Sequence, residues 1–287
     1  MSVRERILHR LTRSDFVRAA YTQSLRVPVV NRLFRKFAHS VVPQSRLWIC
    51  IPGGLAKGFW MYADPRSELG YTNGDHEPWL QNLLQSELRP GDCYYDVGAH
   101  SGFFCLIAAR ILGPSGTVVA VEPDPANISL LRANIERNRL TQASVVQAAI
   151  WSETGEVAFQ AEPDASNGTK GRVLRGAAPS TARSLVPAVR LDDLVFQQGK
   201  PAPDLIKMDV EGAEWEALHS ASRVLSEVKP KVFCEVHDPA QMDPIRLYLE
   251  GFGYTVRDWK PVHEHYADYR QTYLWATVPG ADVRLKN

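Results

Sequence analysis

The sequence predicts an α/β fold, with a mostly parallel sheet of seven strands, helices on both faces and an antiparallel edge. Short apolar runs alternate with amphipathic helical runs from about residue 76 onward, which is typical of βαβ units. A turn with two glycines joins the first apolar run to the helix after it, as in many ligand-binding sheets. The last two apolar runs are the natural pair for the antiparallel edge.

Residues 1–75 precede this regular pattern and are predicted to form an appendage of basic helices and a hairpin, with residues 76–287 as the main domain. Helical patterns dominate to about Arg35. The apolar runs 47–51 and 59–62 flank Pro52-Gly53-Gly54, which favours a small hairpin between them.

The elements of the main domain follow in order. A helix at 78–88 begins with Pro78, which a first helical turn tolerates, and ends before Pro90-Gly91. Short apolar runs then predict strands at 93–97, 117–122, 144–149, 204–209, 231–236, 254–257 and 273–278. Helical periodicity predicts helices at 102–112, 125–138, 211–226 and 241–251. Residues 162–184 follow a predicted hairpin arm and lack periodicity, which predicts a long loop. Its position in the chain is that of a lid over the site.

The turn after the first predicted strand reads Asp-Val-Gly-Ala-His-Ser-Gly over residues 96–102, and Glu122 ends the second predicted strand. Glycines allow a tight turn and a close approach of the backbone to a ligand, and an acid at the next strand tip can grip ribose hydroxyls. The pattern is that of a nucleoside-binding, Rossmann-like βαβ unit. Its spacing favours S-adenosylmethionine over a dinucleotide, because only Gly98 and Gly102 of a three-glycine motif are present.

Several acids of this unit have two interpretations. Asp96 is interpreted as an acceptor for loop amides or for the ammonium group of the ligand, and alternatively as a loop cap. Glu122 can accept both ribose hydroxyls or be an exposed charge at a strand end. Asp124, before Pro125, favours a helix N-cap over a peripheral contact to adenosine. The predicted cofactor contacts are Asp96, Gly98, Ala99, His100, Gly102, Glu122, Pro123, Ala148 and Asp209.

A second strong pattern covers residues 205–214, where a buried strand delivers Asp209 to the carboxyl edge of the sheet. Glu211 is predicted to open the following helix, where the helix dipole alone also favours an acid. His237 ends the next strand and can take a proton from a hydroxyl, or it is a satisfied loop histidine. Lys207, inside the strand, is interpreted as structural with an acid as partner. The catalytic candidates are Asp209, His237 and Glu211.

No metal site is predicted from the sequence. The four cysteines form no metal-binding pair, and His263 and His265 lack an acidic partner nearby. Asp209 and Glu211 alone do not establish a metal-assisted enzyme. The cysteines are interpreted as buried hydrophobes in a reducing compartment. Because neither a signal peptide nor a bilayer-spanning run is visible, we expect a cytoplasmic protein.

Charge is unevenly distributed along the chain. Residues 1–50 carry ten Arg or Lys against two acids, so their net charge is +8 and the remaining residues carry −7. The favoured interpretation is a solvated helical face that packs on the acidic body. A peripheral membrane or anionic-surface contact through residues 1–50 is the alternative, supported by interleaved apolar residues. Nucleic acid is not an expected partner, and the oligomeric state stays open.

Taken together, residues 71–270 resemble the FkbM family of S-adenosylmethionine-dependent methyltransferases. The matching segments are 95–99 with Gly102, Glu122-Pro123, Asn134 with Asn138, 189–194, 206–214 and 235–237. The resemblance implies a class I methyltransferase fold, S-adenosylmethionine as methyl donor and a hydroxyl acceptor on a sugar, polyketide or other natural product. His100 departs from the family, which commonly has Asn there.

The sequence thus predicts O-methylation of a small-molecule or glycan hydroxyl. A nicotinamide-dependent oxidoreductase built on the same βαβ unit is an alternative, but it predicts a third loop glycine and a Tyr-x-x-x-Lys pair, and neither is seen. A non-catalytic scaffold is a further alternative. It predicts a disrupted cofactor pocket, whereas Gly98, Gly102, Glu122 and Asp209 are all present.

Overall fold

The computed structural model describes residues 45–164, 168–174, 184–259 and 272–279. Two compact units divide the chain, one within Met1–Pro78 and Asp164–Gly168, the other within Trp79–Pro163 and Thr169–Asn287. The predicted N-terminal helices, most of the predicted lid, and His263 and His265 lie outside the described residues. The predicted domain boundary at residue 75 stays a prediction.

The described part of the first unit contains the predicted hairpin. Strand β1 (Leu47–Cys50) pairs antiparallel with β2 (Trp60–Ala63), and helix α4 (Leu69–Asn73) follows. Glu68 is fully buried, and its carboxylate lies 2.7 Å from the guanidinium of Arg46. An interior ion pair therefore ties the residue before β1 to the start of α4.

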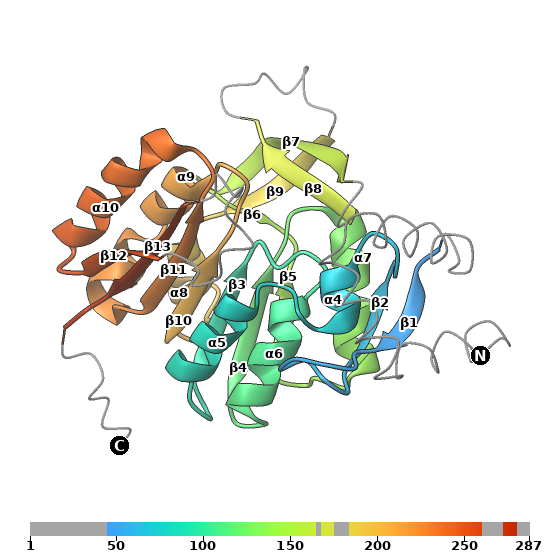
Figure 1. The fold of residues 1–287 in the computed structure, drawn as a ribbon. Helices are drawn as coiled ribbons and strands as arrows, with labels where there is room; N and C mark the ends of the chain where they lie inside the picture. Colours follow the sequence, from blue (N-terminus) through green and yellow to red (C-terminus); the bar gives the residue numbers. More distant parts are fainter. Residues whose placement is uncertain (1–44, 165–167, 175–183, 260–271, 280–287) are drawn as a thin grey trace, which may run out of the picture. The chain divides into compact units, whose positions relative to one another are not determined.

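The second unit is built on a seven-stranded sheet in the order β12-β13-β11-β10-β3-β4-β5 (Figure 1). Strand β13 runs antiparallel to both of its neighbours, β12 and β11, whereas β11, β10, β3, β4 and β5 pair in parallel. The predicted mostly parallel sheet with an antiparallel pair at one edge is confirmed. The strands are β3 (Cys93–Val97), β4 (Thr117–Val121), β5 (Ala143–Val146), β10 (Leu205–Met208), β11 (Lys231–Val236), β12 (Thr255–Trp259) and β13 (Thr272–Thr277).

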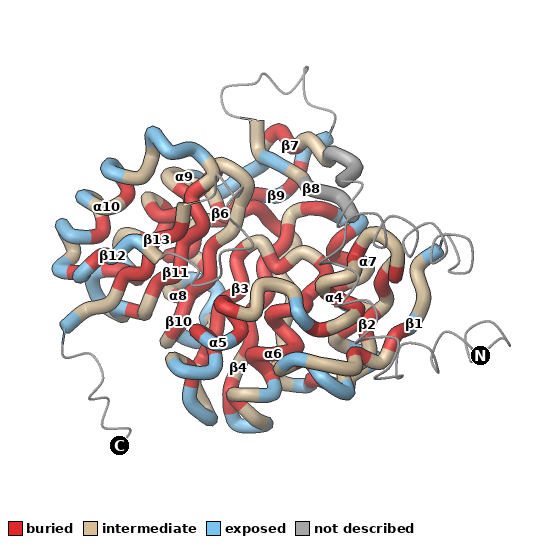
Figure 2. Tube along the Cα trace, viewed as in Figure 1, coloured by how far each residue is buried: buried red, intermediate tan, exposed pale blue. Residues whose placement is uncertain are grey.

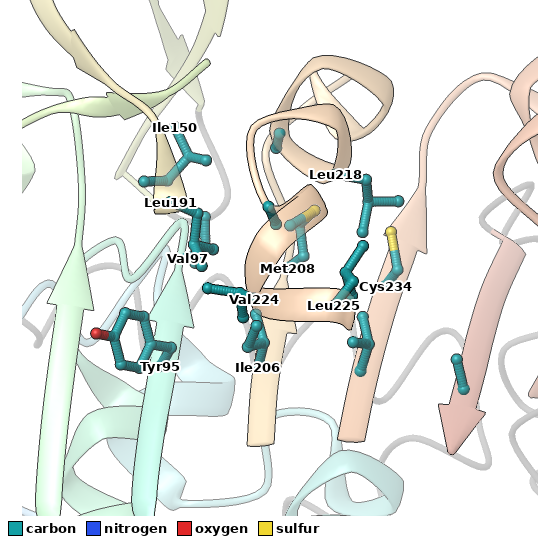
Figure 3. Close-up of a cluster of buried hydrophobic side chains, with 14 of the residues drawn as sticks. Tyr95, Val97, Ile150, Leu191, Ile206, Met208, Leu218, Val224, Leu225 and Cys234 are labelled. Carbon is teal, nitrogen blue, oxygen red and sulfur yellow. The ribbon is translucent and has the colours of Figure 1, made fainter. Parts of the chain in front are cut away.

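Helices cover both faces of this sheet. On one face, Trp79 of α5 packs against Phe233 of β11, with 5.6 Å between ring centroids. On the other face, apolar side chains from α8, α9, a short π-helix and α10 pack on Val97, Met208 and Cys234 of three adjacent strands (Figure 3). The helices are α5 (Pro78–Glu87), α6 (Phe103–Leu112), α7 (Pro125–Arg137), α8 (Leu191–Phe196), α9 (Glu214–His219), the π-helix Val224–Val228, the 3-10 turn Pro239–Gln241 and α10 (Met242–Gly251).

The central strands β3, β10 and β11 are almost wholly buried (Figure 2). Burial on both faces explains their nearly continuous apolar sequence. Their carboxyl ends lie together at one edge of the sheet, which places residues 96–102, 209–211 and 237 beside one another.

The predicted third strand at 144–149 is divided in two. Strand β5 ends at Val146, and β6 (Ala149–Ile150) joins a second sheet in the order β6-β9-β7-β8. This sheet also contains β7 (Gly155–Asp164), β8 (Gly168–Val173) and β9 (Ser184–Val189). Ala149 is buried with Phe159 and Val186 in a small separate cluster. Ala149 therefore packs within the second sheet, and strand β5 of the main sheet ends before it.

Part of the predicted loop at 162–184 is instead strand. Strand β7 continues to Asp164, and β8 occupies Gly168–Val173. A Cβ on Gly171 would lie 2.0 Å from the ring of Phe159, so a glycine covers that ring where a larger side chain has no room. This strand consequently lacks the apolar alternation by which sequence patterns identify strands.

The predicted helix at 211–226 begins later and is shorter. Helix α9 starts at Glu214 and ends at His219, and the π-helix follows from Val224. Glu211 and Gly212 have φ angles of +49° and +96°, which a right-handed helix excludes. Glu211 therefore lies in a turn before the helix, so the prediction that it opens the helix is wrong.

No helix in the described part of the chain combines the length and apolar character needed to cross a bilayer. The four cysteines are free, and Cys93, Cys105 and Cys234 are buried. Their interpretation as small buried hydrophobes is confirmed for these three.

Candidate active site

Gly98 allows the first loop to touch the loop after β10. Its φ angle is +80°, and a Cβ at this position would lie only 1.7 Å from the carbonyl oxygen of Asp209. Strands β3 and β10 are parallel neighbours, with Val97 in register with Met208, so their loops leave the sheet together. The glycine predicted for close approach to a ligand is thus required by contact between two loops of the site.

Backbone N–H groups of the loop are largely used within the chain. Gly98 and Ala99 donate to the carbonyl oxygen of Val121, at 2.9 and 3.0 Å. Gly102 donates to Ala99 at 2.8 Å, and His100 donates to the carboxylate of Glu122 at 2.8 Å. These four bonds fix the conformation of the loop before α6 begins.

Glu122 is buried and holds the loop in place. Its carboxylate accepts hydrogen bonds from the backbone of His100 (2.8 Å) and Asp124 (3.0 Å) and from Asn127 Nδ2 (3.3 Å). Burial raises the pKa of Glu122 to about 7, against the opposing effect of these donors. A carboxylate has about four acceptor sites, so one remains for a ligand. Accepting both ribose hydroxyls requires one internal donor to leave.

Asp124 supplies a further acceptor beside Glu122. Its Oδ1 accepts from the backbone of Ala126 at 2.8 Å, which confirms the predicted N-cap of α7. Its Oδ2 is buried and has no hydrogen-bond partner among the described residues. Buried acceptors are normally satisfied, so this oxygen, together with Glu122, fits a ligand with two hydroxyl donors. Pro123, between the two acids, is partly exposed.

Asp96 faces the interior of the protein. The side chain is fully buried, with its Oδ1 3.4 Å from Lys207 Nζ and its Oδ2 3.1 Å from Cys105 Sγ. Burial raises the pKa of Asp96, and the charge of Lys207 opposes this rise. This carboxylate therefore contacts an interior cation and a thiol.

Lys207 is a site residue that sequence reasoning placed only in a structural role. Its Nζ donates to the carbonyl oxygen of Gly98 at 3.0 Å and lies 3.2 Å from Asp209 Oδ2. It also pairs with Asp96, as expected for an acid partner, and its side chain is only 4% exposed. The available signal was a lysine inside an apolar strand. Its register with Asp96 is visible only once the strands pair.

Asp209, Glu211 and His237 come together at the carboxyl edge and are called here the acid–histidine cluster. One ligand atom from each lies within 4.8 Å of the others. His237 Nε2 is 3.2 Å from Glu211 Oε2 and 3.7 Å from Asp209 Oδ1. Because the backbone turns at Glu211 and Gly212, the Glu211 side chain returns toward the strand ends. The three predicted catalytic residues thus share one place.

Glu214 orients the imidazole of this cluster. Its Oε1 lies 2.8 Å from His237 Nδ1 and also accepts from the backbone of Gly212 at 2.9 Å. Burial lowers the pKa of His237, but the Glu214 hydrogen bond and nearby carboxylates outweigh it and raise the pKa to about 9. The role of Glu214 was not predicted, because in the sequence this residue looks like an ordinary acid in a first helical turn.

Ala148 lies apart from these groups. It occupies the break between β5 and β6, and its side chain is buried in the main apolar cluster. Any contact with a ligand at this position would involve the backbone, as the sequence analysis expected for an alanine.

Comparisons with known proteins find a matching family model and several similar methyltransferases. The family model "Methyltransferase FkbM domain" matches residues 96–256. The 31-O-demethyl-FK506 methyltransferase FkbM of Streptomyces tacrolimicus is 32% identical over 197 residues, covering 59% of this chain and 75% of that protein. The hexuronic acid methyltransferase AglP of Haloferax volcanii is 30% identical over 162 residues, covering 56% of this chain and 62% of that protein.

Among solved structures, the comparison finds a methyltransferase FkbM from Methylobacillus flagellatus KT. It is 19% identical, with a TM-score of 0.48, and the match covers 72% of this chain and 53% of that one.

Proposed function

The chain belongs to the FkbM methyltransferase family and has a class I Rossmann-like fold, and from this premise we propose that it transfers a methyl group from S-adenosylmethionine to a hydroxyl of a sugar, polyketide or other natural product. The observation that carries the proposal is the acid–histidine cluster of Asp209, Glu211 and His237 at the carboxyl edge. It lies directly beside the loop of Gly98. Ligands of open α/β sheets bind at that edge.

The donor site we propose is formed by residues 98–102, Glu122 and Asp124. The remaining acceptor capacity of Glu122 and the unpartnered Oδ2 of Asp124 suit ribose hydroxyls. The loop has two of the three glycines of a dinucleotide-binding turn, which disfavours the pyrophosphate of a nicotinamide dinucleotide. When bound, S-adenosylmethionine supplies an activated methyl group on a sulfonium, so the protein need not create a leaving group.

The residues of the chain must then align the acceptor oxygen and remove its proton. Alignment alone can supply effective molarities of about 10⁵ M or more, and a positioned base adds about 10²–10⁴-fold. The carboxylates of Asp209 and Glu211 are 29% and 30% exposed, so they face solvent and an incoming hydroxyl. With its raised pKa, His237 is protonated at neutral pH, which favours a carboxylate as the base.

The named substrates of the relatives support the acceptor class. One relative is named for 31-O-demethyl-FK506 and another for a hexuronic acid, and both compounds carry hydroxyl groups. A small-molecule or glycan alcohol is therefore the proposed acceptor. The contact of residues 1–50 with an anionic surface remains a further proposal, since nearly all of that segment lies outside the described residues.

Transfer of a radiolabelled methyl group to a panel of hexuronic acids, hexoses and polyketide alcohols tests the proposal. We expect turnover with at least one acceptor, reduced about 10²-fold or more in Asp209→Asn if its carboxylate is the base. His237→Ala should also lose turnover. Glu227→Gln is the control, because Glu227 is 53% exposed and pairs with Arg223 on its own helix. Full turnover in both site variants would contradict the assignment.

A further inference from the structure

We propose that Asp209, Glu211 and His237 bind one divalent cation of the first transition series, which would in turn bind the acceptor oxygen. This ion would take the place of a side chain that acts directly as the base. Its role in methyl transfer rests on the proposed function. Its binding can be measured without any transfer. Among the described residues, this is the one group of three or more side chains with metal-ligating atoms in mutual reach.

The distances within the cluster fit a single ion. Nitrogen and oxygen ligands lie about 2.0–2.2 Å from such an ion, so two ligands on the same ion are separated by roughly 3–4 Å. His237 Nε2 lies 3.2 Å from Glu211 Oε2 and 3.7 Å from Asp209 Oδ1. Small side-chain adjustments therefore suffice to place all three atoms on one cation.

The second observation concerns the imidazole of His237. Its Nε2 is buried and forms no hydrogen bond with any described residue, although carboxylate oxygens of three acids lie within 3.7 Å. Its Nδ1 is held by Glu214 at 2.8 Å, and Glu214 is itself held by the backbone of Gly212. A metal-binding histidine almost always gives its other ring nitrogen to a carboxylate in this way. Nε2 is thus oriented toward Asp209 and Glu211, and a cation bound there would replace the proton that this nitrogen carries in the metal-free protein.

Charge in this region also favours a cation. The carboxylates of Glu214 and Glu235 are almost fully buried beside His237, and Asp209 and Glu211 add two more. Lys207 Nζ contacts Asp209 Oδ2, and the other oxygen, Asp209 Oδ1, faces His237. Lys207 therefore orients Asp209 so that Oδ1 is on the side of His237.

The donor set indicates the kind of ion and its use. One imidazole nitrogen and two carboxylate oxygens suit Mn²⁺, Fe²⁺, Co²⁺ or Zn²⁺. Three protein ligands leave positions open for substrate. When bound, the ion would lower the pKa of a hydroxyl held in one of these open positions and so favour release of its proton to water.

Binding of Mn²⁺ to the metal-free protein, followed by the electron paramagnetic resonance signal of free Mn²⁺, tests the site. We expect one Mn²⁺ per chain, displaced by Zn²⁺, with affinity at least tenfold weaker in Glu211→Gln and His237→Gln. The control Glu227→Gln should bind as the wild type does. Absence of saturable binding to wild type, or equal binding by all four proteins, would overturn the proposal.

A second measurement needs no variant. Electron spin echoes of the bound Mn²⁺ should carry modulation from an imidazole nitrogen, and echoes without it would exclude His237 as a ligand. Turnover measured in EDTA, and after Mn²⁺ is returned, separates the two proposals. Loss in EDTA with recovery supports the ion. Undiminished turnover in EDTA overturns its role while leaving methyl transfer intact.

Discussion

At the scale of single residues, Lys207 connects the two halves of the site. Its ammonium group lies between Asp96 and Asp209 and donates to the carbonyl oxygen of Gly98. Ion pairs this deeply buried contribute little net stability when intact, but removing one partner leaves an uncompensated charge. Lys207 therefore orients Asp209, and its charge opposes the rise that burial causes in the pKa of Asp96.

Lys207→Met should lower the free energy of unfolding by about 3–5 kcal/mol, because it leaves Asp96 buried without its cation. Lys231→Met is the matched control. Lys231 pairs with Glu87 at 2.8 Å, but both side chains are about a quarter exposed, and such pairs contribute about 0.2–1 kcal/mol. Urea unfolding measures both values. Equal losses in the two variants would show that the interior pair has no special role.

Glu122 should make donor binding depend on pH. In the free protein its pKa is about 7, and a carboxylate that accepts ribose hydroxyls must be ionised. Affinity for S-adenosylhomocysteine should therefore be constant above pH 7 and fall by up to about tenfold per pH unit below it, as expected for one linked proton. Calorimetric titration over this range measures the slope.

Two variants control this pH experiment. Glu122→Gln should bind more weakly and lose the slope, whereas Glu136→Gln, which alters an exposed acid on α7, should keep it. An unchanged slope in Glu122→Gln would assign the linked proton to another group.

Gly98 offers a test of contact between the two loops. Gly98→Ala and Gly253→Ala both place a side chain at a φ angle near +80° to +85°, but only Gly98 has a neighbour within 4 Å. Backbone strain should cost each about 1–2 kcal/mol, and overlap with Asp209 should cost Gly98→Ala about 1–3 kcal/mol more. Urea unfolding compares them. Indistinguishable stabilities would contradict the close approach.

Sequence patterns identified those site residues that can be recognised from the residues next to them in the chain. Gly98, Glu122 and Asp209 follow strands and so could be assigned to the sheet edge. The roles of Lys207, Glu214 and the unpartnered oxygen of Asp124 depend on residues distant in sequence. Such contacts exist only after the strands pair, so a single sequence does not contain them.

At the scale of elements, the strands of the main sheet were predictable because burial on both faces makes their apolar runs nearly continuous. Helix α9 was placed too early, since the acids at 211 and 214 suit a helix start while the φ angles at Glu211 and Gly212 exclude one. Strand β8 was missed because Gly171 covers an aromatic ring. In each case tertiary packing decided against the local pattern.

The N-terminus of α7 gives a prediction at this scale. Asp124→Ala removes the side chain that accepts from Ala126 and should destabilise the protein by about 1 kcal/mol. It should also weaken binding of S-adenosylhomocysteine, because Oδ2 is proposed to face the ribose. Asp238→Ala removes a similar cap from the 3-10 turn Pro239–Gln241 and should leave that binding unchanged. If both variants bind alike, Asp124 serves only as a cap.

At the scale of the whole molecule, sheet topology explains why one chain can hold both reactants. The parallel order β11-β10-β3-β4 brings the loops that carry His237, Asp209, Gly98 and Glu122 to the same edge. Family membership and a mostly parallel sheet with an antiparallel edge could both be anticipated from the sequence. The identity of the acceptor could not, because the regions outside the family resemblance have no motif that constrains chemistry.

The central claim is that this edge binds S-adenosylmethionine. Isothermal titration of folded protein with S-adenosylmethionine and S-adenosylhomocysteine tests it most directly, with NADH as the competing ligand. We predict saturable binding of both sulfur compounds at one site per chain and none of NADH. Absence of heat and saturation with either sulfur compound, on protein shown to be folded, would contradict the account.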